Sequence, residues 1–429
     1  MTRNFKGLLR YRWLVYLLIA SVYFFVYFHR VSPAVMGHEF AREWSLGGTS
    51  LGIMSSLYLY LYAAAQIPAG ILADFIGPKK LIIFSASTMA LGSFLSYIAP
   101  TFTMLAVGRA LIGLGAGFTL IPLAKILLYW FRKREFATML GLNISIGNVG
   151  AIFASTPLMA LMTLVGWRNA FLYISVVTFA LTIMNMRCVK NTPEEMGFPP
   201  IEQDKTNIIK QTSIQMTIKN GVHEWFRNHT FPLITIMITI SYGTLISFEG
   251  LWAGPFLADV YKMSNTGIGN WLLTMAIGMV IGQASSGYLS DKVFKGRRKI
   301  LIITGSVFYA LNWVLLLIVI SSQQYLLFLR FLFFTFAIAN SIASVSTMAL
   351  IRDLAPEESY GTIMGICNTI TFIGGAFFQT ITGNILDRSK PIIENGMKVF
   401  SLKGYLSAFI PSTIAAFLCI FLALLIKEN

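Results

Sequence analysis

Two stretches with the same polar spacing, QIPAGILADFIGPKK (66–80) and QASSGYLSDKVFKGRRK (283–299), decide the fold of this chain. Each carries a glutamine, a glycine and an aspartate, and positions 66, 70 and 74 of the first copy recur 217 residues later, at 283, 287 and 291. Each stretch ends a long apolar segment and runs into a basic loop. This pattern indicates two copies of one membrane module, each placing a carboxylate and a basic cluster at the same bilayer face.

The composition is that of an integral membrane protein. Of the 429 residues, 56% are hydrophobic and only 12% are charged, whereas a soluble protein carries about a quarter charged residues. Apolar runs of at least ~18 residues, enough to cross ~30 Å of hydrocarbon, recur along the whole chain. The alternation typical of a membrane β-barrel is absent. We therefore expect a multi-pass, all-α membrane protein.

The net charge of +15 does not indicate nucleic-acid binding. Lysines and arginines fall in short loops between apolar runs, where they set membrane orientation. The cysteines Cys188, Cys367 and Cys419 lie in or beside apolar segments without metal-ligand spacing, so we expect no metal, cofactor or disulfide. No catalytic constellation and no phosphate-cradling loop is evident, so we expect neither an enzyme nor an ATP-driven pump.

The apolar runs divide into two halves of six. We place the N-terminal half at 1–189, a cytoplasmic linker at 190–229 and the C-terminal half at 230–429, with 214–226 as a candidate helix on the membrane surface. The basic loops gather on one side, so both termini should be cytoplasmic. The predicted spans are roughly 12–36, 48–74, 79–99, 102–131, 136–164, 168–189, 230–260, 266–291, 298–321, 324–352, 360–386 and 403–427.

Further matches extend the repeat. Arg109 and Arg330 occupy corresponding places in spans four and ten, and Gly141 and Gly150 match Gly365 and Gly374. Parallel halves of this kind fit a fold whose solute site lies at the midplane between them.

These stretches resemble the major facilitator superfamily. GILADFIGPKK (70–80) and GYLSDKVFKGRRK (287–299) are similar to its duplicated loop signature, and GWRNAF (166–171) resembles its turn before span six. RYRWLVYLLIASVYFFVYFHR (10–30) and NTPEEMGFPPIEQ (191–203) resemble its organophosphate:phosphate antiporter and organic anion:cation symporter branches. The resemblance implies two pseudo-symmetric six-helix bundles that carry a solute by alternating access.

The duplicated signature, together with this resemblance, also implies residues that control opening. Asp74 and Asp291 are placed to accept hydrogen bonds from a neighbouring helix N-terminus, or to pair with an arginine, and so hold the cytoplasmic side closed. For Arg109, hydrogen bonding to carbonyls of a neighbouring helix is an equal alternative. The candidate gating residues are Gly70, Asp74, Gly77, Lys79, Arg109, Gly287, Asp291, Arg297 and Arg330.

The chain departs from the phosphate-ester branch at two places. Span seven, TISYGTLISFEGLWAGPFL (239–257), has no arginine, and its only charge is Glu249. Gly147 stands where those antiporters have a histidine. A doubly charged phosphate would be poorly neutralised here, so the resemblance favours another organic solute.

Charged groups inside apolar spans need an explanation, because placing each one in the membrane costs at least a few kcal/mol. Arg30 could bind a substrate carboxylate through its planar fork of donors, or it could reach toward the outer interface. Glu249 could exchange the coupling proton, or it could lie hydrogen-bonded at the outer mouth. The two could also pair across the cavity. Tyr27, Asn148, Trp252 and Asn368 are further candidates for solute contact, although such residues more often serve packing.

We therefore expect a secondary active transporter for a small organic acid, amino acid or peptide, coupled to protons. An organophosphate/phosphate exchanger and a non-transporting solute sensor remain alternatives. The expected partners are the solute, H⁺ and the lipid bilayer, without nucleic acid. The expected setting is a monomer in a bacterial inner membrane.

Overall fold

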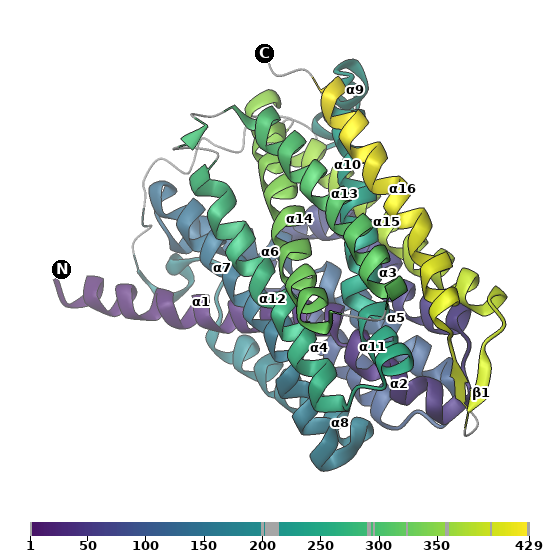
Figure 1. Cartoon of the computed structure of the whole chain (residues 1–429). Helices are drawn as coiled ribbons and strands as arrows, with labels where there is room; N and C mark the ends of the chain where they lie inside the picture. The colour runs from purple at the N-terminus through teal and green to yellow at the C-terminus, as the bar shows by residue number, and fades with distance from the viewer. Residues whose placement is uncertain are drawn as a thin grey trace.

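Helices dominate the computed structural model, which describes residues 2–198, 201, 214–289, 293–294, 297–322, 325–356, 360–394 and 397–426 (Figure 1). We call α1–α8 the N-half and α10–α16 the C-half. The N-half consists of α1 (Thr2–Val31), α2 (Pro33–Trp44), α3 (Gly48–Phe75), α4 (Pro78–Tyr97), α5 (Phe102–Gly117), α6 (Leu120–Trp130), α7 (Lys133–Phe153) and α8 (Thr156–Cys188).

A short 3₁₀ turn (Pro193–Met196) and the helix α9 (Ile214–Arg227) lie between the halves. The C-half consists of α10 (Thr230–Ser247), a π-helical segment (Phe248–Trp252), α11 (Ala253–Tyr261), α12 (Asn265–Tyr288), α13 (Arg298–Ser322), α14 (Leu326–Leu354), α15 (Tyr360–Arg388), the strands β1 (Ile392–Glu394) and β2 (Met397–Val399), and α16 (Leu402–Leu425). The two strands form an antiparallel hairpin in which Ile392 pairs with Val399.

The helices confirm an all-α, multi-pass membrane protein. Within the described residues, 11 helices are long and apolar enough to span a bilayer, and Thr138–Phe153 is a shorter apolar helix. Large apolar side chains such as Leu327, Leu164 and Phe75 are largely exposed, as expected of a surface that faces lipid. A twelfth span and the side of the termini stay predictions.

Two helix breaks differ from the simple spans expected from the sequence. The predicted first span, 12–36, is interrupted at Ser32, and α2 then continues to Trp44. Pro33 explains this break, because proline cannot donate the backbone hydrogen bond that a continuous helix needs. The boundary predicted near 166 is present, since Gly166 has φ +79° inside α8. Only glycine adopts that conformation readily.

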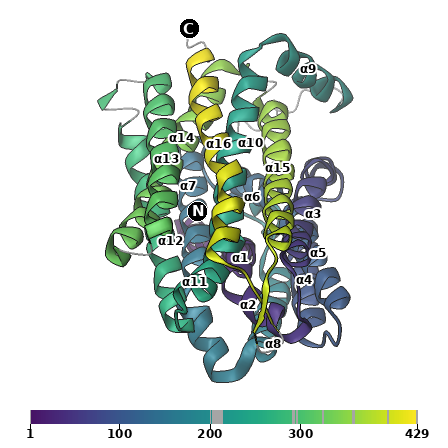
Figure 2. The same cartoon turned by 45° about the vertical axis from the view of Figure 1, so that its right-hand side comes forward.

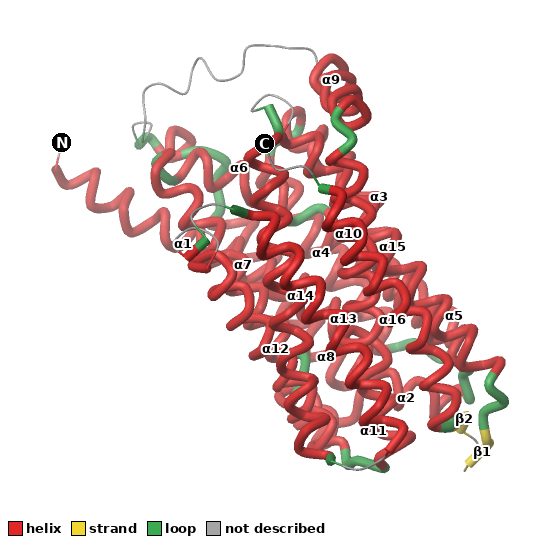
Figure 3. The backbone as a smooth tube through the Cα atoms, turned by 45° about the horizontal axis from the view of Figure 1, so that its top comes forward, coloured by secondary structure: helices red, strands yellow, loops and turns green. Residues whose placement is uncertain are grey.

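The two ends of the molecule differ in what they carry. Figures 2 and 3 show α9 and the C-terminus at one end, which we call the linker face. The hairpin β1–β2 and α2 lie at the opposite end, which we call the hairpin face. Contacts between the halves run mainly along α3 and α15, with α12 against α7 and α8, and with α2 against α11 and the π-helical segment.

Aromatic rings fill the C-half around the π-helical segment. The ring of Phe248 lies 5.7 Å from Trp313, 5.2 Å from Phe333 and 5.3 Å from Phe409. Such tilted and edge-to-face pairs add to the burial of large apolar area. The segment that carries Glu249 is therefore fixed within a rigid core.

The helix expected in the later part of the linker is present as α9. Its residue Trp225 donates through Nε1 to Oγ1 of Thr235 in α10, 3.2 Å away. Gly221 packs so closely on α15 that a Cβ would lie 2.4 Å from the Cβ of Thr362. The helix is therefore attached to the C-half, while Phe226 stays 66% exposed. Its position on a membrane surface stays a prediction.

Candidate functional site

A cavity of about 120 Å³ lies where the two halves meet. Tyr27 and Arg30 of α1 form its N-half wall. Its C-half wall combines polar and apolar side chains of α10, α14 and α15: Ile238, Tyr242, Ser344, Met348, Ile351, Met364, Cys367, Asn368, Thr371 and Phe372. A single water needs only about 10–15 Å³ of such volume, so the space exceeds that of one water several-fold.

Arg30 is the cation of this cavity. Its guanidinium carbon lies 4.4 Å from the ring centre of Tyr27, 5.1 Å from that of Tyr62 and 4.9 Å from that of Phe372. Such stacking holds the charge by cation–π attraction. Arg30 is only 7% exposed, and its Nε has no hydrogen-bond partner. The rings therefore fix the guanidinium without using all its donors.

The break at Ser32 changes the expected surroundings of Arg30. If one continuous helix entered the membrane near Trp13, it could place Arg30 at the outer interface. The chain instead forms twelve further helical residues as α2, about 18 Å of helix beyond the break. Arg30 thus lies buried at the end of α1, facing the cavity. This burial favours the cavity over the outer interface, and the role of Arg30 stays a prediction.

Glu249 is buried in the π-helical segment of the C-half, and its Oε2 lacks a hydrogen-bond partner. It does not line the cavity, and among the described residues no ion pair joins it to Arg30. The next residue, Gly250, faces α1, since a Cβ there would lie 3.6 Å from the carbonyl oxygen of Arg30. The segment that carries Glu249 thus packs against the backbone of Arg30, and the two charged side chains do not pair directly.

The other predicted solute contacts separate into two groups. Tyr27 and Asn368 line the cavity with Arg30. Asn148 of α7 instead donates through Nδ2 to Oε1 of Gln283 in α12, 2.7 Å away, and so links the halves. Trp252 is fully buried, and its Nε1 has no partner.

Arg109 compensates for the break between α1 and α2. In a continuous helix, the carbonyl of His29 would accept a hydrogen bond from residue 33, but Pro33 has no N–H. Nη1 of Arg109 donates to this carbonyl oxygen at 2.9 Å instead. Its guanidinium carbon also lies 5.2 Å from the ring centre of Tyr58. This geometry supports the alternative that Arg109 bonds carbonyls of a neighbouring helix.

A carboxylate closes the hairpin face, and sequence analysis did not identify it. Asp387, at the end of α15, accepts from the backbone N–H of Gly48 through Oδ1 and from that of Thr49 through Oδ2, both at 2.8 Å. These N–H groups begin α3 in the other half, where the helix dipole favours a negative charge. A Cβ on Gly48 would lie 2.6 Å from the carbonyl oxygen of Gly383. The first turn of α3 therefore lies directly against the last turns of α15.

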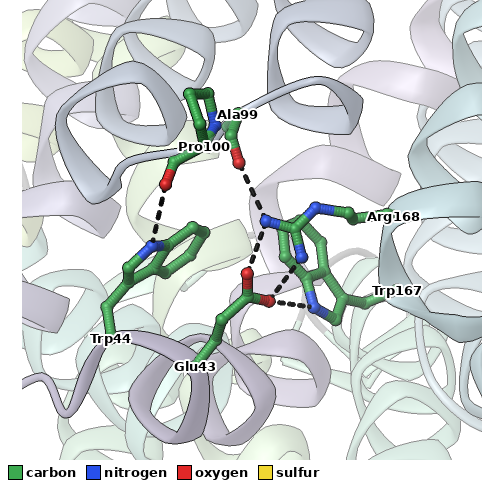
Figure 4. A network of polar contacts seen from close by, with 6 residues as sticks. All are labelled: Glu43, Trp44, Ala99, Pro100, Trp167 and Arg168. Carbon is green, nitrogen blue, oxygen red and sulfur yellow. Dashed lines mark hydrogen bonds and ion pairs between the residues drawn. The ribbon is translucent and has the colours of Figure 1, made fainter.

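The helix α2 makes the second contact of the hairpin face. A Cβ on Gly254 of α11 would lie 1.7 Å from the carbonyl oxygen of Ala34, so the two backbones touch. On its other side, α2 is joined to α8 within the N-half (Figure 4). Oε1 and Oε2 of Glu43 lie 2.5 and 2.6 Å from the guanidinium of Arg168, and Trp167 donates to Oε2 at 3.0 Å.

The same network extends to the loop between α4 and α5. Nη2 of Arg168 donates to the carbonyl oxygen of Ala99 at 2.9 Å, and its guanidinium carbon lies 4.3 Å from the ring centre of Trp167. Nε1 of Trp44 donates to the carbonyl oxygen of Pro100 at 3.5 Å. These bonds make α2 a fixed part of the N-half, although it also touches the C-half.

The first signature loop is anchored to the start of the linker. Gly77 has φ +87° before α4, and the N–H of Lys79 donates to Oδ1 of Asn191 at 2.9 Å. Gly70 lies in α3, where a Cβ would make only an ordinary contact with Ile121. The side chain of Asp74 lies outside what the structure describes.

The second signature is described only in part. Gly287 lies near the end of α12, Arg297 is exposed just before α13, and Asp291 lies outside the described residues. Arg330, the repeat partner of Arg109, is exposed on α14 and donates from Nε to Oγ1 of Thr274 at 3.2 Å. The two arginines that match in sequence therefore occupy different surroundings.

Comparison with known proteins agrees with this architecture. The family model described as Major Facilitator Superfamily matches residues 17–379. The chain is 22% identical to a probable sulfoacetate transporter of Cupriavidus necator, over 90% of this chain and 89% of the relative. It is 25% identical to a probable L-galactonate transporter of Escherichia coli (84% and 80% covered). It is 22% identical to the glycerol-3-phosphate transporter of Bacillus subtilis (81% and 80% covered).

Among solved structures, the chain resembles a bacterial homologue of the human lysosomal transporter Spinster, in its inward-facing and unoccupied conformation, with a TM-score of 0.75. The two are 15% identical, and 97% of each chain is covered. At this identity the likeness shows the fold. With the family match over most of the chain, it identifies the class: the protein belongs to the Major Facilitator Superfamily and is a transporter of a small solute, not an enzyme.

Proposed function

We propose that this protein carries a small organic anion across a bacterial inner membrane by alternating access, driven by protons. The observation that carries the proposal is Arg30, a buried cation stacked on three rings beside a cavity between the halves, with Nε unpartnered. A planar guanidinium suits a carboxylate or sulfonate, because each can accept two parallel hydrogen bonds. Names of the relatives, which include sulfoacetate and galactonate, support an acidic solute.

The opposite wall supports a polar body for that anion. Ser344, Asn368 and Thr371 of the C-half offer hydroxyl and amide groups across the cavity from Arg30. A solute held by both walls would draw the halves together, which is what a carrier needs in order to change its open side. We assign the rocking bodies to residues 1–189 and 230–429, joined by the linker at 190–229.

Glu249 is the proposed proton carrier. A buried carboxylate with one oxygen left without a hydrogen-bond partner is costly to keep charged. Through Gly250, this segment packs against the backbone of Arg30, so an anion arriving at Arg30 would change the electrostatic surroundings of Glu249. This arrangement supports coupling of one proton-exchanging group to solute binding.

The closed contacts identify the proposed gates. Asp387 on Gly48, and Gly254 on Ala34, would keep the hairpin face shut while solute exchanges from the linker face. Asp74 and Asp291 keep their proposed role at the linker face in the opposite state.

Phosphate-ester exchange is the second candidate, because a glycerol-3-phosphate transporter is among the relatives. The site argues against it. A Cβ on Gly147 would lie 2.9 Å from Cδ2 of Tyr27, so the tyrosine occupies the space that a second basic side chain at this position would need. One cation neutralises a monoanion better than a dianionic phosphate.

Counterflow into liposomes separates these functions. The purified protein is loaded with sulfoacetate, sugar acids, amino acids, dipeptides or sugar phosphates, and exchange of labelled solute is measured with and without a pH gradient. Arg30→Gln should weaken anion binding about tenfold or more, as expected for loss of a charge-assisted contact. Arg187→Gln, which removes an exposed cation at the end of α8, is the matched control.

Each other outcome has a defined meaning. Exchange of phosphate esters for inorganic phosphate would favour the second candidate. Solute binding without counterflow would make the protein a sensor. Unchanged anion binding in Arg30→Gln would remove Arg30 from the site.

A further inference from the structure

Arg330 lies outside the cavity between the halves, on the outer surface of the C-half. Only its Nε has a partner among the described residues, Oγ1 of Thr274 on α12. Nη1 and Nη2 form no hydrogen bond within the part of the chain that the structure describes, and they present a fork of donors there. Arg330 is exposed on a helix apolar enough to span a membrane, and a charge at the edge of hydrocarbon is unfavourable unless it finds a partner.

A groove of about 810 Å³ adjoins this guanidinium. Apart from Arg330, it is lined by Thr274 and by apolar or aromatic side chains: Tyr325, Leu327, Phe328, Phe331 and Phe334. Leu327 is 84% exposed and Phe331 55% exposed. The groove therefore presents one cation at the edge of an apolar surface.

The depth of Arg330 matches a lipid headgroup. It is the fifth residue of α14, so it lies about 6 Å from the end of that helix. The span Leu326–Leu354 has 29 residues, about 43 Å of helix, against ~30 Å of hydrocarbon. If the excess is shared between both ends, Arg330 lies at the boundary between hydrocarbon and headgroups. The exposed Tyr325 beside it is typical of that level.

We propose that this groove is a binding site for an anionic phospholipid. The fork of Arg330 donates to the phosphodiester, Thr274 orients the guanidinium through Nε, and an acyl chain lies against Phe331 and Leu327. Charge complementarity favours a lipid of net negative charge, because an ammonium in the same headgroup would offset the attraction of the single cation.

Native mass spectrometry of the full-length protein tests the proposal. The protein is titrated in detergent with phosphatidylglycerol and, separately, with phosphatidylcholine. We expect tighter retention of phosphatidylglycerol. Arg330→Gln should lower that retention about tenfold, the size expected for losing a charge-assisted phosphate contact. Lys403→Gln, an exposed cation near the start of α16 that does not line the groove, should retain the lipid like the wild type.

Two further arms separate a lipid from a free anion and from a second copy of the chain. Phe331→Ser leaves the guanidinium in place but removes apolar lining, so it should also weaken retention of phosphatidylglycerol. Inorganic phosphate at millimolar concentration should not displace the lipid. Equal retention by wild type and Arg330→Gln, displacement by phosphate alone, or a dimer that Phe331→Ser dissociates would each overturn the proposal. Unchanged melting temperatures would show that the variants are folded.

Discussion

Asp387 and Gly48 are joined by a 2.8 Å hydrogen bond across the two halves, although 339 residues separate them in the chain. The carboxylate of the C-half thereby lies at the N-terminus of α3 in the N-half, where the helix dipole is positive. Asp387→Asn keeps the shape but removes the charge, so it should destabilise closure of the hairpin face by about 1–2 kcal/mol. Spin-label distances across that face should show a larger open population, roughly tenfold more.

Asp353→Asn is the control for this change. Asp353 pairs with Arg298 at 3.1 Å inside the C-half, so it loses the same charge without crossing between halves. Equal distance distributions for Asp387→Asn and the wild type would show that the bond does not hold the face closed.

Gly254→Ala should prevent the described closure. A Cβ at this position would lie 1.7 Å from the carbonyl oxygen of Ala34, and backbone on both sides cannot move away cheaply. We expect solute exchange to fall severalfold while the protein remains folded. Gly365→Ala is the matched control, because nothing lies within 4 Å of its added Cβ. Counterflow of both variants measures the difference, and full activity of Gly254→Ala would contradict the contact.

Arg109 and Arg330 should differ in their effect on stability despite their matching places in the sequence. Arg109→Leu leaves the carbonyl of His29 with only the longer 3.3 Å bond from Oγ of Ser32, which should lower the free energy of unfolding by about 1–3 kcal/mol. Arg330→Leu removes an exposed side chain and should change it by less than about 0.5 kcal/mol. Thermal unfolding in detergent compares the two, and equal shifts would refute the structural role of Arg109.

Glu249→Gln should uncouple transport from the proton gradient. The amide keeps the size of the side chain but cannot exchange a proton, so pH-driven accumulation should be lost while solute exchange at equal pH persists. Glu394→Gln, which removes an exposed carboxylate paired with Lys262, should accumulate solute normally. Full accumulation by Glu249→Gln would exclude this residue from coupling.

The pair Arg12–Glu135 predicts an acid-sensitive contact at the start of α7. Burial alone raises the pKa of Glu135, but the N–H of Arg132 and the guanidinium of Arg12 lower it below its ordinary 4.5. A carboxyl group whose pKa is lowered in the folded state stabilises the folded protein at pH values above its unfolded pKa. This stabilisation is lost as the pH falls through the pKa of the folded state.

The gain is below about 1 kcal/mol, because the pair is partly solvated. Glu135→Gln should therefore melt slightly lower than the wild type at pH 7, and the difference should shrink as the pH falls below 4.5 and through the lowered pKa of Glu135. A difference that grows on acidification would contradict this sign.

The sequence predicted features that depend on local chemistry. The length of the apolar runs predicted the helices, and GWRNAF predicted the turn at Gly166. The division into two related halves, drawn from the repeated signature, stays a prediction. The break at Ser32–Pro33 was missed, although a proline after a serine inside an apolar run is a recognisable signal.

Features that depend on distant partners could not be predicted. The partner of Asp387 is backbone, which carries no side-chain signature, and Asn148 meets Gln283 only because the halves fold together. Arg109 and Arg330 look equivalent along the chain, but only the first lies beside a carbonyl freed by a proline. Sequence spacing places residues on a helix and does not decide what the helix faces.

The break after Arg30 has a mechanical consequence. On one side, α2 is joined to α8 by the ion pair of Glu43 and Arg168. On its other side, α2 packs against Gly254 of the C-half. If the C-half moves away, α2 loses that support at Ala34, four residues after Arg30, the proposed solute-binding cation. Opening of the hairpin face and weakening of solute binding at Arg30 would then occur in one movement of α2. Such a link would limit uncoupled transport by the empty carrier.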